Sequence, residues 1–358
     1  MRISVSPSET RFNARFIVRL AVAAGLAATA WLAPQAASAA SPTVDKIRAR
    51  GELVCGVSQG SAGLSLPDSS GRWSGLDVDY CRALAAAVLG DGEKVRFVPL
   101  SSANRFPVLQ SGDIDVLARN TTWTVTRDAS LNALFVGTLF YDGQGFLVPK
   151  KLGVTSARQL NGAAVCVQPG TVNEQNLVDY FRANAMTFRP VVIESLPELE
   201  AAFYAGRCDV YLSDASTLAA SRANRAPRVE DFVILPERIQ KSPLSPVVRN
   251  SDPAWFQIAR WTLNLLIEAE ETGITSANVD QLRTSSRDPN IRRILGVTPG
   301  VAEALGLDAE WARRIVKAVG NYGEIYQRNL GPGTRLNLER GQNALWNQGG
   351  LLYAPPFQ

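Results

Sequence analysis

Two consecutive stretches of this 358-residue chain repeat the same order of strand and helix patterns, and this repeat constrains the fold more than any other feature. The first stretch predicts strand 53–58, helix 77–89, strand 95–100, helix 104–110 and strand 114–118. The second predicts strand 163–168, helix 173–183, strand 188–193, helix 197–205 and strand 208–212. Each stretch is expected to form a βαβαβ unit with a mostly parallel sheet and helices on both faces, so the fold class is α/β.

A local fingerprint supports the repeat. Leu109–Val116 and Phe203–Val210 both place a glycine three residues after an apolar residue and then continue to Asp-Val. Glycine favours the position just past a helix, so both fingerprints predict a helix end followed by a strand. Open parallel sheets bind ligands beyond the carboxyl ends of their strands, and two such lobes facing each other would enclose a ligand.

Two extended segments connect the predicted lobes. Residues 141–149 are rich in glycine and then strand-like, and residues 241–248 are extended because of their prolines. Two crossings predict a hinge between a discontinuous first lobe, 40–145 and 242–358, and a second lobe, 146–241. Helical patterns at 253–271, 288–295 and 308–330 predict a helical C-terminal extension, whereas residues 349–358 give no indication of their role.

The N-terminus has the pattern of a secretory signal. Arginines precede an apolar run at 20–32, and the small residues at 37–40 fit a cleavage site. The alternative is a membrane anchor, but roughly 13 apolar residues are too few to span a bilayer. Residues 1–39 are therefore predicted to be a signal peptide that is cleaved near Ala39 or Ala40 during export.

Charge excludes two classes of partner. Residues 1–39 hold four of the 37 Lys and Arg side chains and one of the 33 Asp and Glu side chains. The remaining chain is therefore nearly neutral, which gives no electrostatic footprint for nucleic acid or for anionic lipid.

Four cysteines in an exported chain indicate disulfides, with three possible connectivities. Cys55 lies in the first predicted strand and Cys81 on the apolar face of the next helix, while Cys166 and Cys208 lie in predicted strands of the second lobe. We therefore expect Cys55–Cys81 and Cys166–Cys208, one bridge per lobe, with free buried thiols as the alternative. The chain has no histidine and no C-x-x-C motif, so no metal site is expected.

The segment from Arg105 to Arg127 carries the first indication of a binding site. It predicts a short helix ended by Gly112, a buried strand, a polar loop at 119–124 and a second helix with Arg127 in its first turn. Negative charge is favoured at a helix N-terminus, so a cation there is unusual. Loop hydroxyls, free N–H groups and an arginine together would receive a small carboxylate. The alternative, a surface arginine beside a polar turn, stays open on these residues alone.

Several motifs together resemble the extracytoplasmic solute-binding proteins of polar amino-acid ABC transporters, bacterial family 3, and in particular the branch described as general L-amino-acid-binding proteins. The motifs are Gly75–Cys81, Arg105–Arg127, Gly170-Thr171, Gly206–Asp209 and Trp261–Ile274. The resemblance implies a type II periplasmic-binding-protein fold, in which two Rossmann-like lobes are joined by a two-strand hinge. It also implies a monomeric periplasmic receptor without cofactor or enzymatic activity. Such a receptor closes on a free L-amino acid and delivers it to the permease subunits in the inner membrane.

The resemblance also assigns roles to individual residues. It makes Arg127 the bidentate partner of the ligand α-carboxylate, with Thr122 and the Thr171 N–H as further donors. Asn120 is expected to contact the α-ammonium, and Asp214 is expected to be its counter-charge, because a dehydrated zwitterion needs a paired anion and cation. The alternatives are helix capping by Thr171, with Glu174 three residues on, and by Asp214.

Two features bear on the ligand side chain and on a rival function. Many relatives place an aromatic residue just after the first strand, but residues 59–65 contain none, which predicts a roomy or polar pocket. Arg105 resembles the arginine that acidic-amino-acid binders direct at the side chain, so the predicted range is broad and leans to Glu, Asp, Gln and Asn. The rival is a cyclohexadienyl or arogenate dehydratase-like enzyme on the same fold, in which Asp214 or Glu174 would replace the absent histidine in acid–base chemistry.

Overall fold

The computed structural model of the protein describes residues 1, 2, 4 and 41–358. The chain divides into two units, Met1–Ser38 and Ala39–Gln358, of which the second is described below. Apart from those three residues, the predicted signal peptide and its cleavage site lie outside the described residues, so they stay predictions. Among the described helices, none combines the length and the apolar character needed to cross a membrane.

The first sheet has the strand order β4-β1-β5-β13-β6 and defines what we call the first lobe. Its strands are β1 (Leu53–Val57), β4 (Val95–Pro99), β5 (Val116–Leu117), β6 (Ala133–Phe135) and β13 (Val247–Arg249). Strand β1 pairs in parallel with β4 and β5, whereas β13 pairs antiparallel with β5 and β6.

The second sheet has the order β11-β7-β10-β8-β9, with β12 also paired to β7, and defines the second lobe. Its strands are β7 (Phe140–Pro149), β8 (Ala164–Val167), β9 (Arg189–Val192), β10 (Val210–Asp214), β11 (Phe232–Ile234) and β12 (Gln240–Leu244). Strand β8 pairs in parallel with β9 and β10, and β7 pairs antiparallel with β10, β11 and β12. A further small sheet joins β2 (Leu66–Pro67) to β3 (Trp73–Ser74).

The strand order confirms the repeat that the sequence predicts. In both copies the first strand lies between the second and the third, as β4-β1-β5 and as β9-β8-β10. The strands within each repeat are parallel, as predicted, and the strands outside the repeats add antiparallel neighbours. The predicted strand 208–212 is displaced: it begins at Val210, so Cys208 lies before it and not within it.

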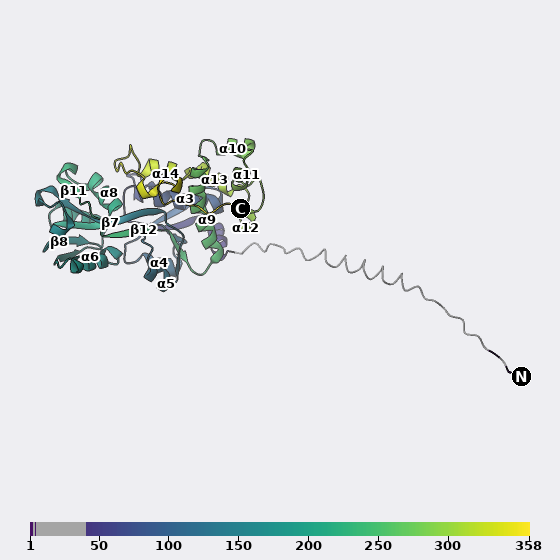
Figure 1. The fold of residues 1–358 in the computed structure, drawn as a ribbon, viewed down its shortest axis with the longest axis horizontal. Helices are drawn as coiled ribbons and strands as arrows, with labels where there is room; N and C mark the ends of the chain where they lie inside the picture. Colours follow the sequence, from purple (N-terminus) through teal and green to yellow (C-terminus); the bar gives the residue numbers. More distant parts are fainter. Residues whose placement is uncertain (3, 5–40) are drawn as a thin grey trace. The chain divides into compact units, whose positions relative to one another are not determined.

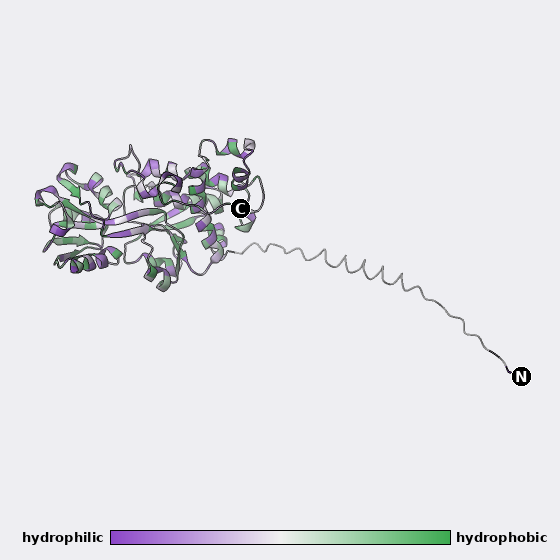
Figure 2. Cartoon of the chain, in the orientation of Figure 1, coloured by the Kyte–Doolittle hydropathy of each residue, from purple (hydrophilic) through white to green (hydrophobic). Residues whose placement is uncertain are grey.

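Helices cover both faces of the sheets. Those of the repeats and their flanks are α2 (Pro42–Arg50), α3 (Leu76–Leu89), α4 (Arg105–Ser111), α5 (Val125–Ser130), α6 (Val172–Ala183), α7 (Leu196–Tyr204) and α8 (Ala215–Arg225). In the second lobe, one apolar cluster includes Leu177 and Phe181 of α6 and another includes Leu199 and Phe203 of α7. Figure 2 shows the corresponding alternation of hydrophobic and hydrophilic residues along the helices.

The C-terminal extension belongs to the core of the first lobe. Its helices are α9 (Pro253–Glu271), α10 (Val279–Ser285), α11 (Pro289–Ile294), α12 (Val301–Ala304), α13 (Trp311–Val319) and α14 (Tyr322–Asn329). Trp255 and Trp311 are fully buried in the same apolar cluster as Tyr80 of α3. Burying such large rings in one cluster fixes the extension to the first repeat.

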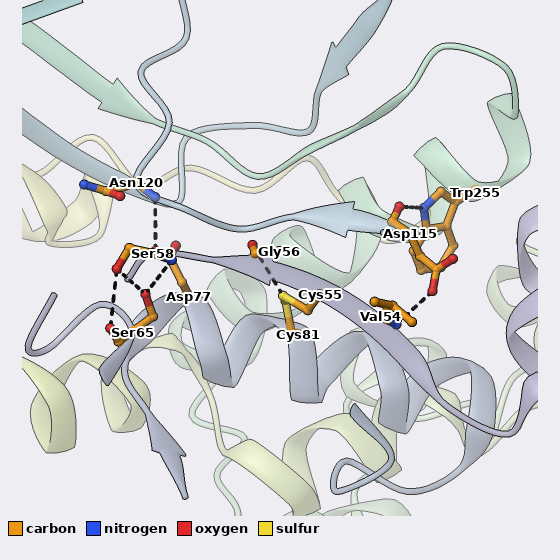
Figure 3. The surroundings of a disulfide bond; sticks show 10 residues. All are labelled: Val54, Cys55, Gly56, Ser58, Ser65, Asp77, Cys81, Asp115, Asn120 and Trp255. Carbon is orange, nitrogen blue, oxygen red and sulfur yellow. Dashed lines mark hydrogen bonds between the residues drawn. A yellow bond between two sulfur atoms is a disulfide. The ribbon is translucent and has the colours of Figure 1, made fainter. Parts of the chain in front are cut away.

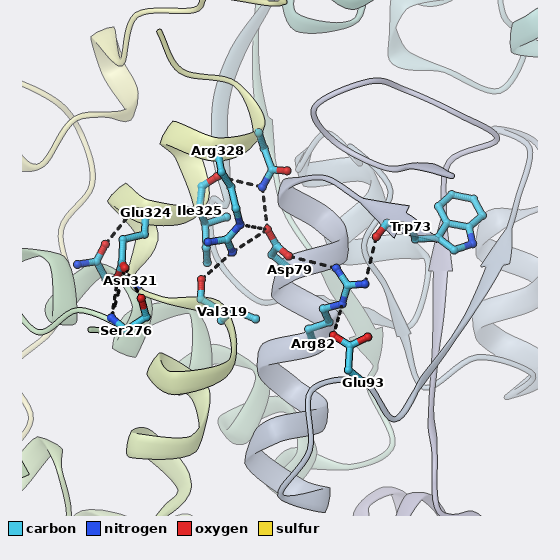
Figure 4. Close-up of polar contacts among 11 residues, drawn as sticks. Trp73, Asp79, Arg82, Glu93, Ser276, Val319, Asn321, Glu324, Ile325 and Arg328 are labelled. Carbon is cyan, nitrogen blue, oxygen red and sulfur yellow. Dashed lines mark hydrogen bonds and ion pairs between the residues drawn. The ribbon is translucent and has the colours of Figure 1, made fainter. Parts of the chain in front are cut away.

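The predicted long helix 308–330 is wrong in one respect, because the structure divides it into α13 and α14. Gly320 adopts φ 77° and ψ −171°, a conformation that favours glycine and ends α13. Asn321 then begins α14 with a capping box, since its side chain accepts from the Glu324 N–H and the Glu324 carboxylate accepts from the Asn321 N–H. Figure 4 shows how α14 is held to α3: Asp79 accepts hydrogen bonds from Arg328 at 2.8 Å and Asn329 at 2.7 Å.

Two chain crossings connect the lobes, as predicted. Strand β7 enters the second lobe and β12 leaves it, and they pair antiparallel from Phe140↔Leu244 to Gln144↔Gln240. In Figure 1, β7 lies beside α6 and α8 of the second lobe, and β12 lies on the side toward α3, α9 and α14 of the first. The residue boundaries of the two lobes stay a prediction.

Candidate functional site

A small polar pocket lies between the two lobes. It is lined by Ser58, Ser102, Arg105, Arg119, Asn120, Thr122 and Arg127 of the first lobe, and by Gln168, Thr171, Val172, Asn173, Leu196, Ser213, Asp214 and Thr217 of the second. All six residues assigned from the sequence lie in this lining: Arg105, Asn120, Thr122, Arg127, Thr171 and Asp214. Other hollows are larger and more open, but this pocket brings together three arginines and a buried aspartate.

Arg127 is held in place by its own lobe. Thr124 caps α5, because its hydroxyl accepts from the Arg127 N–H, and this puts the arginine in the first helical turn. The Arg127 Nη1 donates to the Thr122 carbonyl at 3.0 Å, and the guanidinium carbon lies 5.4 Å from the centre of the Phe106 ring. These contacts orient the guanidinium and leave donors for a planar anion.

Three guanidinium groups converge in the first lobe, which is electrostatically costly without an anion. Burial, with repulsion from Arg119 and Arg127, holds the pKa of Arg105 well below its usual range. Burial lowers the pKa of Arg119 and of Arg127 to about 10. Within the described part of the chain, Arg105 Nε has no hydrogen-bond partner. The pocket therefore favours a negatively charged group beside these arginines.

The loop between β5 and α5 supplies further polar groups. Asn120 has a positive φ of 33°, which asparagine tolerates better than most residues, and its N–H donates to Asp77 at 3.1 Å (Figure 3). Its side-chain Oδ1 is buried and has no partner among residues 41–358. Thr122 is buried and forms an isolated bridge to Leu244 on the returning hinge strand.

Thr171 and Asp214 line the pocket from the second lobe. Of the two, only Thr171 caps a helix with its side chain. Thr171 caps α6, since its hydroxyl accepts from the Glu174 N–H at 3.3 Å and donates to the Gln168 carbonyl at 2.8 Å. Asp214 stands at the N-cap position of α8 but makes no side-chain cap bond, and its Oδ1 is buried without a described partner. Burial and then repulsion from Asp142 raise the pKa of Asp214 to about 7, while Ser242, Arg105 and Arg127 oppose this.

Contacts across the pocket join the lobes. The Gly170 carbonyl of the second lobe accepts from Arg105 at 3.3 Å and from Arg127 at 3.5 Å. A Cβ atom on Gly170 would lie 3.2 Å from the Ala103 Cα, so the two backbones approach closely there. The conformation described is therefore one in which the lobes meet around the pocket.

Sequence reasoning missed Arg119 and Asp77. Arg119 is buried and donates to the Leu100 carbonyl at 2.9 Å and the Ser102 hydroxyl at 3.0 Å. Burial raises the pKa of Asp77 to about 7, although the Asn120 N–H and the Arg119 charge both act to lower it. The available signal for Arg119 was its place immediately after the predicted strand 114–118.

The structure joins Cys55 to Cys81 and Cys166 to Cys208, the pairs that the sequence predicts (Figure 3 shows the first). Each bridge lies within one lobe, so neither restrains the hinge. No group of three or more His, Cys, Asp or Glu residues within the described ranges is arranged to hold a metal ion.

The lobes, the two crossings and the pocket between them define the type II periplasmic-binding-protein fold. Residues 53–278 match the family described as bacterial extracellular solute-binding proteins, family 3, and the chain belongs to that family.

Relatives of nearly full length extend this similarity. The chain is 51% identical to the glutamate/glutamine/aspartate/asparagine-binding protein BztA of Rhodobacter capsulatus, over 90% of this chain and 95% of that protein. It is 50% identical to the general L-amino acid-binding periplasmic protein AapJ of Rhizobium johnstonii, over 91% and 96% respectively. The solved structure of an ABC transporter periplasmic binding protein from Brucella ovis with glutathione bound has a TM-score of 0.86 and 49% identity. That match covers 89% of this chain and 100% of the other.

Proposed function

We propose that the protein is a periplasmic receptor that binds L-amino acids by hinge closure and delivers them to an ABC permease in the inner membrane. The single observation that carries the proposal is the pocket, where Arg105, Arg119 and Arg127 face Asp214 across the lobe boundary. A zwitterion brings an anion to the arginines and a cation to the aspartate, and so offsets the burial of both.

Individual roles follow from this arrangement. In the proposal Arg127 binds the α-carboxylate, with help from Thr122 and the Thr171 N–H, while Asp214 and Asn120 bind the α-ammonium. Arg105 is directed at the ligand side chain. The ligand range is broad and leans to Glu, Asp, Gln and Asn, which agrees with what the name of the Rhodobacter capsulatus relative states for that protein.

Thermal-shift screening of the purified mature protein against the twenty amino acids tests the proposal. A ligand that binds only the folded protein stabilises it by about 2.7 kcal/mol at a concentration of 100 times Kd. We expect Glu, Gln, Asp and Asn to raise the melting temperature in proportion to the logarithm of concentration. If no amino acid raises it, the receptor assignment is wrong.

The proposal also holds that the protein is not an enzyme. A carboxyl group with a pKa of about 7 in a cleft is suited to acid–base catalysis, so Asp214 gives the dehydratase alternative a specific basis. Incubation with prephenate or arogenate, followed by ultraviolet detection of an aromatic product, separates the two. Aromatic product that disappears in Asp214→Asn would replace the receptor proposal by the enzyme.

Export is part of the same proposal. We expect the protein in the periplasmic fraction as a monomer whose first residue follows Ala39 or Ala40. Mass spectrometry of the intact protein and light scattering of the purified sample measure both quantities. An uncleaved N-terminus would contradict the proposed signal peptide.

A further inference from the structure

We propose that Asp142, on the hinge strand β7, is a positioning residue for the ligand. It caps helix α8 in place of Asp214, and its charge sets the pH range in which Asp214 can receive an ammonium group. This inference rests on the proposed function, in which Asp214 is the counter-charge of the ligand.

The N-terminus of α8 is capped by Asp142 and not by its own N-cap residue, Asp214. Asp214 occupies the N-cap position of this 11-residue helix, where an aspartate would ordinarily accept from the first-turn N–H groups, yet it makes no such bond. Asp142 accepts from the Ser216 N–H at 3.2 Å, and its other oxygen accepts from the Gly143 N–H at 2.8 Å. The cap is therefore supplied from the hinge strand, and Asp214 Oδ1 has no partner in the described residues.

The strand register places Asp142 and Asp214 near each other. Asp214 pairs with Gln144 across β10 and β7, and Asp142 is two residues earlier on β7. Residues two apart on a strand share a face, so both carboxylates lie on the same face of the sheet. Asp214 is buried, at 4% exposed, whereas Asp142 is half-buried.

Charged and polar groups surround both carboxyl groups. Burial raises the pKa of Asp142, while the Ser216 hydroxyl, the N–H groups of Gly143 and Ser216, and the Arg238 guanidinium oppose this rise. Asp214 faces Asp142 on β7, the Ser242 hydroxyl on β12 and three cations of the other lobe, Arg105, Arg119 and Arg127. Tyr211, on its own strand, has its pKa raised mainly by burial and stays neutral.

The protonation state of Asp214 determines how ligand affinity changes with pH. An ammonium group binds the ionised form of Asp214, so ligand affinity is full above about pH 7 and falls as the pH drops through the pKa of this carboxyl. The limit is about tenfold per pH unit for one group. Asp77 has a pKa near the same value, so the wild-type profile alone does not isolate Asp214. The change of the profile when Asp142 is replaced does isolate it.

The test is calorimetric titration with glutamine, whose side chain does not titrate, at about pH 5.5 and about pH 8. Asp142→Asn removes the charge and keeps one acceptor, so the ratio of Kd at low pH to Kd at high pH should fall at least about threefold below the wild-type ratio. Asp142→Ser, which is smaller and also uncharged, should lower the ratio in the same way if the asparagine variant folds poorly. Glu200→Gln is the matched control, because Glu200 is a buried acid of the same lobe that does not act on Asp214.

The outcomes separate this inference from the proposed function. Wild-type affinity in Asp214→Asn would show that the ammonium lies elsewhere and would overturn both. Weak binding in Asp214→Asn, together with a wild-type Kd ratio in folded Asp142→Asn and Asp142→Ser, would overturn the role of Asp142 alone. A ratio that falls equally in Glu200→Gln would also overturn it, because any buried charge of the lobe would then suffice.

Discussion

Replacing Arg127 by lysine keeps a positive charge in the pocket but removes the geometry that the structure prepares. The Nη1 bond to the Thr122 carbonyl and the contact with Phe106 hold the guanidinium, which leaves other donors for a carboxylate. Lysine has a single ammonium group and cannot make the internal bond and a two-point contact with the ligand together. Losing one charge-assisted hydrogen bond of about 2 kcal/mol corresponds to about thirtyfold in Kd.

Calorimetric titration of Arg127→Lys with the best ligand from the thermal-shift screen measures this loss. Arg182→Lys is the matched control, since Arg182 is on α6 and its side chain is 77% exposed. The melting temperature of the ligand-free protein should stay nearly unchanged, because lysine keeps the positive charge on α5 and can keep one bond to the Thr122 carbonyl. Wild-type affinity in Arg127→Lys would mean that the carboxylate binds elsewhere and would refute the reasoning.

Three further predictions concern the second lobe and the disulfides. Asp214→Asn should weaken binding at least tenfold. The ligand-free form of Asp214→Asn should melt higher than the wild type at pH 8. The pKa of Asp214 is raised to about 7 in the folded protein, so its contribution to folding stability is lost as the pH rises through that value and the carboxyl group ionises in the interior. Equal melting temperatures would contradict a buried charge at this position. Gly170→Ala should weaken binding, because the added Cβ meets Ala103 only when the lobes close. Gly206→Ala, with a similar φ of 78° and no atom within 4 Å, controls for backbone strain, and equal affinity of the two variants would contradict the closure contact. Non-reducing peptide mapping should find one bridge within each lobe, Cys55–Cys81 and Cys166–Cys208, each contributing about 2–4 kcal/mol to stability. A disulfide between the lobes would contradict the fold.

The repeat could be predicted from the sequence because it depends on local patterns. Hydrophobic period and helix-ending glycines identified the strands and helices of both copies, and the strand order followed from the βαβ connection. The helix pattern 308–330 misled because Gly320 lies within a continuous amphipathic run and glycine is tolerated inside helices. The useful signal was Asn321 followed by Glu324, the spacing of a capping box.

Some residues of the candidate site could also be predicted from local sequence patterns, and others could not. Arg127 and Asp214 stand beside recognisable element ends, so motif and position pointed to them. Asp142 and Arg119 depend on packing between distant segments, such as the bond from the Ser216 N–H to a hinge residue 74 positions earlier. A single sequence contains no pattern for contacts of that kind, so the position of Arg119 after a strand was a signal only for its location and not for its partners.

The C-terminal tail is the clearest example of such a long-range contact. The Asn343 side chain accepts from the Tyr141 N–H at 2.7 Å and donates to the Tyr141 carbonyl at 2.9 Å, so it pairs with the hinge strand as a neighbouring strand would. The start of β7 is thereby fixed to the C-terminal extension. We therefore expect bending during closure to fall on the residues after Tyr141, where Gly143 and Gly145 carry no side chain. Because Asp142 lies at the beginning of that segment, the residue that caps α8 is also part of the expected hinge.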